Sequence, residues 1–238
     1  MRFRGFITGL LLLLVACAET PQVTEFSYAP EINVFALLLL NNQQKIIHIE
    51  QSYPVTEVVP ENRGIADARV TITSDNQAVP FSHLVNGLYV EAADVLQLMA
   101  GKKYRLQIVL SDGRQVRGEC TIPHPPGITT PQPGIPVPAY TAVEIAWESK
   151  ARAPRYQVSV RGNMFGFSAE VGTDSLHTTF YPFLLAQPDI YVLKVAALDA
   201  NYHDYLRVAE DQPPLFRLQG ALGVFGAMSH DEVILIAQ

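Results

Sequence analysis

The chain has 238 residues, of which 48% are hydrophobic and 17% are charged, and its formal net charge is −6. This balance is typical of a folded protein and excludes an intrinsically disordered chain. A net acidic chain without a cluster of lysines and arginines is a poor match for nucleic acid, whose phosphates need cations, so no nucleic-acid partner is expected.

The N-terminal segment has the pattern of a lipoprotein signal. Two arginines and an apolar run occupy residues 2–15, and the run leads into Leu-Val-Ala-Cys, which ends at Cys17. A positive start, about ten apolar residues and a small-residue site define a secretory signal, whereas a membrane-spanning helix needs about 20 residues. The cysteine at the cleavage point resembles a bacterial lipobox. We therefore predict that residues 1–16 are a signal peptide and that lipid on Cys17 anchors the mature chain in the cell envelope, at the outer membrane.

The second cysteine is predicted to be structural. With lipid on Cys17, Cys120 has no disulfide partner, so the fold must rely on its hydrophobic cores. Cys120 lies in an alternating pattern at residues 115–122 and is interpreted as a small buried strand residue. A disulfide between the two cysteines is the alternative, which the lipobox disfavours.

The first half of the mature chain, residues 17–124, is predicted to be an immunoglobulin-like β-sandwich. Short alternating strands are separated by turn signals every 8 to 12 residues or so, which indicates antiparallel sheets. Asn86-Gly87 is the strongest of these signals, because this dipeptide favours a two-residue hairpin turn. Only residues 93–99 are expected to be helical. The main expected strands are 32–40, 45–52, 68–73, 88–90, 104–110 and 115–122.

Prolines are concentrated in the middle of the chain. Seven of the 17 prolines fall between Pro123 and Pro138. Because proline fixes φ and has no N–H donor, this stretch is not expected to be a helix or an interior strand. We predict that residues 125–138 are an extended, semi-rigid linker between two independent domains.

The second half, residues 139–238, is predicted to be another antiparallel sandwich, with strands at 142–147, 156–160, 190–199 and 233–236. Trp147 alternates with its apolar neighbours and is expected to lie in the core. The strands resemble those of a fibronectin type III module, in which Trp147 takes the place of the core tryptophan and Tyr191 that of the tyrosine corner. The resemblance ends near Asp199.

A narrower resemblance follows from motifs spread over the whole mature chain. After the lipobox and the first hairpin come the segments 68–72, 101–106, 121–123, 202–206 and 223–227. Their order resembles that of a family of two-domain bacterial lipoproteins described as a domain of unknown function. The family is common in Bacteroidota and is often encoded beside TonB-dependent outer-membrane receptors. The resemblance implies a location and an architecture, and it implies no activity.

No catalytic or metal-binding signature stands out in the sequence. The six histidines form no pair at i, i+2 or i, i+4, and no cysteine accompanies them, so no metal, no cofactor and no enzymatic activity are expected. Gly220, Gly223 and Gly226 do not have dinucleotide-binding spacing and are predicted to let two backbones pack closely or to form bulges. Residues 230–232 are predicted to be a solvated loop before the last strand.

Two features are candidates for contact with other molecules. Tyr202, His203 and Tyr205 are expected in a polar loop and are candidate partner contacts, since tyrosine offers a large contact area at low entropic cost. Residues 174–176, Asp-Ser-Leu, match a short O-glycosylation signal of secreted Bacteroidota proteins, which would place a glycan on Ser175.

Together these features predict a non-enzymatic accessory or interaction module, anchored at the bacterial outer membrane, with a TonB-dependent receptor as a candidate partner. The alternative is a glycan-binding surface lipoprotein, in which exposed aromatic side chains would stack on sugar rings.

Overall fold

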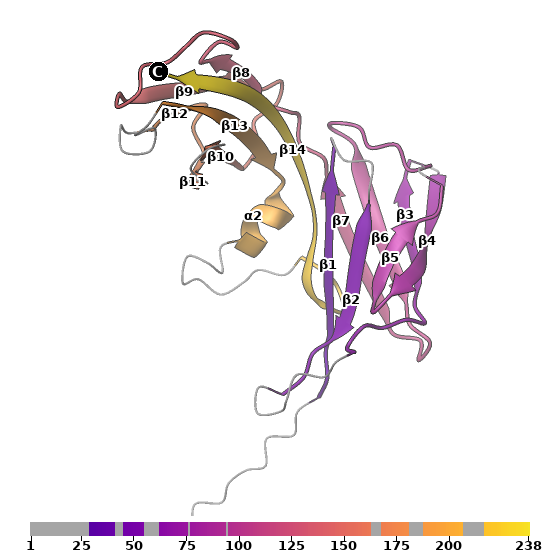
Figure 1. Ribbon diagram of the computed structural model, residues 1–238. Helices are drawn as coiled ribbons and strands as arrows, with labels where there is room; N and C mark the ends of the chain where they lie inside the picture. The colour runs from indigo at the N-terminus through magenta and orange to yellow at the C-terminus, as the bar shows by residue number, and fades with distance from the viewer. Residues whose placement is uncertain are drawn as a thin grey trace, which may run out of the picture.

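The computed structural model describes residues 29–40, 45–54, 62–75, 77–93, 95–162, 168–180, 188–206 and 217–238. The expectation of an all-β protein is confirmed, and Figure 1 shows its strands in two modules. Cys17 and the predicted signal peptide lie outside the described residues. No helix within the described ranges is long and apolar enough to cross a membrane. The elements are β1 (Ile32–Leu39), β2 (Ile46–Gln51), β3 (Arg69–Ser74), β4 (Gln77–Val85), β5 (Leu88–Glu91), β6 (Lys103–Val109), β7 (Gln115–Thr121), β8 (Gly127–Thr130), β9 (Val143–Glu148), β10 (Arg155–Gly162), β11 (Ser168–Thr173), β12 (His177–Phe180), β13 (Asp189–Leu198), α2 (Ala200–Leu206) and β14 (Leu222–Ala237).

The first module consists of β1 to β7 and the first half of β14. Its strands follow the order β14-β1-β2-β5-β4-β3-β6-β7 in one curled sheet. The sheet curls far enough for Arg117 of β7 to form a two-way backbone bridge with Gln219, just before β14. Alternating residues of each strand point into a single core, as the alternating burial of β6 illustrates, and Tyr89 and Tyr104 are among its largest fully buried side chains.

The hairpin predicted at Asn86-Gly87 is confirmed between β4 and β5. Both residues have positive φ, 43° and 73°, as a two-residue hairpin turn of this type requires. Glycine is needed at the second position for a further reason, because a Cβ on Gly87 would lie 2.1 Å from the carbonyl oxygen of Ile49.

The helix predicted at residues 93–99 is wrong, because the described residues of this segment, 93 and 95–99, are not helical. Side chains of the first module form hydrogen bonds with the backbone of this segment. The Tyr104 hydroxyl donates to the carbonyl of Gln97 at 2.8 Å and accepts from the N–H of Met99 at 2.9 Å, and the Glu91 carboxylate accepts from the N–H of Leu96. Leu96 itself is buried in the core.

The second module is a sandwich of two facing sheets. One sheet has the order β11-β10-β13-β14 and the other β12-β9-β8. Trp147 of β9 is 2% exposed, and its ring meets that of Tyr156 on β10 edge-on at 5.3 Å between centroids. The prediction that Trp147 is a core residue is therefore confirmed, and the sandwich is the one that the fibronectin type III resemblance implies.

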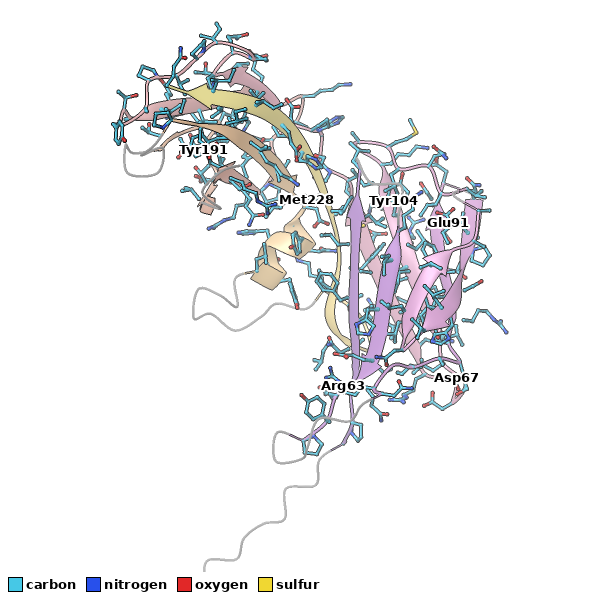
Figure 2. The ribbon with its side chains drawn as sticks, in the orientation of Figure 1. Arg63, Asp67, Glu91, Tyr104, Tyr191 and Met228 are labelled. Carbon is cyan, nitrogen blue, oxygen red and sulfur yellow. The ribbon has the colours of Figure 1, made fainter. Side chains whose placement is uncertain are left out.

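Strand β14 runs through both modules (Figure 1). Residues 222–228 pair in parallel with β1, and residues 228–237 pair antiparallel with β13. Met228 is the crossing point, since it is opposite Leu39 of β1 and Leu198 of β13, and Figure 2 shows it on β14 between the modules. The structure here differs from the expected domain limits, because the first half of β14 adds a strand to the first module. The predicted loop at residues 230–232 is also wrong, since these residues lie within β14.

The proline-rich stretch is attached to the second module and is only partly the extended linker that was predicted. Residues 127–130 form β8, an edge strand, which is a position where neighbouring prolines are tolerated. The N–H of Ile128 donates to the Asp231 carboxylate at 3.0 Å. Val137 exchanges two backbone hydrogen bonds with the end of β14, to Ile236 and from Gln238.

Candidate functional site

The three predicted contact residues, Tyr202, His203 and Tyr205, are brought together on helix α2, so the prediction of a loop is wrong. Asp199 starts the helix, because its carboxylate accepts from the N–H of Tyr202 at 2.9 Å and its carbonyl accepts from the N–H of His203 at 3.0 Å. An aspartate at this position is a common helix-capping residue. The signal was present in the sequence, but the helix is only seven residues long and has little periodicity to reveal it.

Helix α2 is attached to both β7 and β14. The side-chain amide of Asn201 donates to the carbonyls of Glu119 and Phe225, each at 2.7 Å. Gly226 of β14 allows the helix to approach, since a Cβ there would lie 2.9 Å from the Cβ of Tyr202. This supports the prediction that the glycines near the C-terminus permit close packing, and Figure 1 shows α2 beside the middle of β14.

The Asp199 carboxylate is buried where α2, β7 and β14 meet, at 6% exposure. Burial raises the pKa of this carboxyl to about 6, and hydrogen bonds from backbone groups of Tyr202, Ala227, Asn201 and Thr121 partly oppose the rise. The same junction affects Cys120. Its thiol is buried as predicted, and burial, then the nearby Asp199 charge, raises its pKa well above the usual value.

The side chains of α2 are largely engaged within the molecule. The Tyr205 ring meets that of Phe35 on β1 edge-on, with 6.0 Å between centroids. His203 Nδ1 lies 3.4 Å from the carboxylate of Asp204, and that buried carboxylate also accepts two contacts from the Arg217 guanidinium. A partner role for the three predicted residues stays a prediction, and these contacts give them a structural role.

Next to α2 lies a groove of about 610 Å³ that sequence reasoning missed. Its floor is the outer face of the β6–β7 hairpin. Asn201 of α2 borders it, as do Arg217 and Gln219 of the segment before β14, by which we mean residues 217–221. The lining side chains are mostly polar. They include Arg105, Gln107, Arg117, Glu119, Asn201, Arg217 and Gln219.

Among the described residues in and around this groove, cations outnumber carboxylates. Glu119 is shared by Lys103 at 2.6 Å and Arg105 at 3.0 Å, and these hydrogen bonds lower the pKa of its carboxyl. Arg217 is paired with Asp204. The Arg117 guanidinium has one hydrogen-bond partner among the described residues, the neutral Oε1 of Gln115 at 2.7 Å.

A second candidate surface is an aliphatic ladder on the outer face of β13 and β14, at the C-terminal end of β14. Ile190 is directly opposite Ile236, and Val192 is directly opposite Ile234. The four side chains are between 37% and 61% exposed. Contiguous exposed apolar side chains of this kind mark interaction surfaces more often than scattered ones do.

Two further expectations concern metal ligands and the glycosylation signal at Ser175. Groups of three or more potential metal ligands are absent from the described part of the chain. Ser175 lies in a bend between β11 and β12, half-buried, with its hydroxyl 3.2 Å from His177 Nδ1. The structure therefore places the predicted glycosylation signal at the end of an edge strand.

The fold defines a class of protein: an all-β chain with two modules that share one strand. Residues 19–233 match the model of the family described as "Domain of unknown function (DUF4249)", and the chain belongs to that family. No curated protein matches the chain. Among solved structures, the chain is similar to a two fibronectin type III domain segment from chicken tenascin, with 13% identity, 72% of this chain and 91% of that chain covered, and a TM-score of 0.28.

Proposed function

We propose that the protein is a non-enzymatic interaction module, anchored by lipid on Cys17 at the bacterial outer membrane, and that it serves an outer-membrane receptor of the TonB-dependent type. The observation that carries the proposal is the aliphatic ladder of Ile190, Val192, Ile234 and Ile236, which offers an apolar, β-branched face to a protein partner.

The position of the ladder fits an anchored protein. The described chain begins at Ala29, beside the start of β1, whereas the ladder lies at the C-terminal end of β14, at the other end of the molecule (Figure 1). An anchor before β1 would leave this end free to meet a partner. The continuous strand β14 would hold the ladder in a fixed orientation relative to the first module.

The grooves also support binding over catalysis. Among the described residues, the lining of the larger groove has one carboxylate, Glu119, and that of a smaller groove has one, Asp75. General acid–base catalysis of glycoside hydrolysis, in contrast, uses two carboxylates about 5–10 Å apart.

The ladder proposal is tested by affinity purification of the full chain from solubilised membranes, followed by mass spectrometry. The double variant Val192→Glu/Ile234→Lys replaces two opposed aliphatic side chains with an opposite-charge pair, which suits an antiparallel sheet. We expect it to lose the receptor. The matched control, Leu84→Glu/Val85→Lys, changes two exposed residues of β4 and should retain it. Loss with both variants, or with neither, would refute the role of the ladder.

The anchor is tested separately. Cys17→Ser should accumulate as an unprocessed, larger precursor and should incorporate no acyl label. Normal processing and labelling of this variant would contradict the proposed lipid attachment and the location that depends on it.

A further inference from the structure

The groove beside α2 combines elements that are far apart in the sequence. Arg105 and Gln107 come from β6, and Arg117 is directly opposite Gln107 on β7. Gln219 is hydrogen-bonded through its backbone to Arg117, which places the segment before β14 against the hairpin. The groove therefore exists only because the end of the chain returns to the first module.

The size and polarity of the groove suit a small polar ligand. Its volume, about 610 Å³, falls within the usual range for ligand sites. Among the described residues, the groove and its rim hold four cations, Lys103, Arg105, Arg117 and Arg217, and two carboxylates, Glu119 and Asp204. They carry an excess of two positive charges in a chain whose net charge is −6.

Arg117 is the cation best placed to take an anion. Its partner among the described residues is a neutral amide, whereas the guanidinium groups of Arg105 and Arg217 face Glu119 and Asp204. The planar guanidinium binds carboxylate and phosphate groups through two parallel hydrogen bonds. Gln107 and Gln219, on either side, carry side-chain amides that can donate to and accept from hydroxyl groups.

The net charge of the protein restricts the class of ligand further. A protein with a net charge of −6 repels a dense polyanion at long range, so the local positive excess suits a ligand with few charges. A saccharide that carries an anionic group suits the groove, since it combines few charges with many hydroxyl groups that the glutamine amides can bind.

We propose that the groove formed by the outer face of β6–β7, α2 and the segment before β14 binds an acidic saccharide, with Arg117 on its anionic group and Gln107 and Gln219 on its hydroxyls. This site is distinct from the aliphatic ladder. The Val192→Glu/Ile234→Lys variant should therefore bind the saccharide normally, which separates a failure here from a failure of the proposed receptor interaction.

The experiment is isothermal titration calorimetry with the full chain in detergent. The probes are trigalacturonate, which carries carboxylates, glucose 6-phosphate, which carries a phosphate, and methyl-esterified trigalacturonate, which has the same rings without charge. We expect one of the two acidic probes to bind with one-to-one stoichiometry, and the probe that binds identifies the anionic group. The methyl ester should bind at least about tenfold more weakly than trigalacturonate if the carboxylate is recognised.

Variants locate the site. Arg117→Ala should weaken binding by about tenfold or more, because it removes a charge-assisted hydrogen-bond donor. Arg117→Lys should retain only part of the affinity, since lysine keeps the positive charge but lacks the planar guanidinium that makes two parallel hydrogen bonds. The control is Arg114→Ala, which removes an exposed arginine of the same hairpin that pairs with Asp112 outside the groove.

Three results would overturn the proposal. They are no binding of either acidic saccharide, equal loss with the Arg114 and Arg117 variants, and inorganic phosphate binding as tightly as the acidic saccharides. Arg117 is exposed, so its variants are expected to fold, and the circular dichroism and thermal unfolding of the full chain check this.

Discussion

The two halves of β14 belong to one continuous strand and have different surroundings. In the first half, residues 223–227 are all buried, because the core of the first module covers one face and α2 packs on the other. In the second half burial alternates, and Ile234 and Ile236 are exposed. One strand can therefore complete two cores. Its outer face stays accessible to a partner only in the second half, where no other described element covers it.

The largest expected effect is on the core that the second half of β14 helps to enclose. Trp147→Ala should cost about 3–5 kcal/mol of unfolding free energy. The indole nitrogen has no hydrogen-bond partner among the described residues, so the loss is one of packing. Chemical denaturation measures it. In the native protein, Trp147 fluorescence should be blue-shifted. A red-shifted, readily quenched signal would contradict the assignment.

The first half of β14 depends on close backbone contact. Gly223 has φ of 97°, and a Cβ there would lie 2.0 Å from the carbonyl oxygen of Val34 on β1. Gly223→Ala should therefore cost about 4 kcal/mol through backbone strain and overpacking. Gly113→Ala is the matched control, because φ there is 86° and no atom lies within 4 Å of the added Cβ. Equal thermal shifts for the two variants would show that the contact with β1 is unimportant.

The free energy of unfolding should depend on pH through Asp199, at the junction between the two halves of β14. The folded-state pKa of Asp199, about 6, exceeds its ordinary value of 3.8, so the folded state binds this proton more tightly. Stability from this group is therefore fully present below pH 3.8 and is lost as the pH rises through about 6, by about 3 kcal/mol in total. Denaturation at several pH values should show the loss in the wild type relative to Asp199→Asn. Parallel pH profiles would refute the assignment.

The smallest expected change in unfolding free energy comes from the contact between α2 and β1. Tyr205→Ala removes an edge-on ring contact with Phe35 and should cost about 1 kcal/mol. An exposed loop tyrosine would cost less than about 0.5 kcal/mol. Thermal unfolding distinguishes the two. A change within error would indicate that Tyr205 is free to serve a partner, as the sequence alone suggested.

Local signals in the sequence predicted most of the strands. Alternation identified β3, β6 and β9, and the Asn86-Gly87 turn identified the β4–β5 hairpin, because each depends on residues close together in the chain. The burial of Trp147 followed from the same alternation.

The features that depend on distant pairing could not be predicted in this way. Residues 222–228 lie far in sequence from β1, and their own pattern does not reveal which strand they join. The groove has the same origin, since Arg117 and Arg217 line it together because the chain returns to β7 at the Arg117–Gln219 bridge. Helix α2 was missed because its stability comes from the Asp199 cap and from packing on Gly226 rather than from helical periodicity.

The architecture depends most on β14 being one strand that serves both modules. Amide hydrogen exchange of the full chain, read by mass spectrometry on peptides covering residues 222–228 and 229–237, tests this directly. Because the first half is paired with β1 and the second with β13, we expect slow exchange in both peptides. Rapid exchange of residues 222–228 beside protected residues 229–237 would show that β14 does not serve the first module.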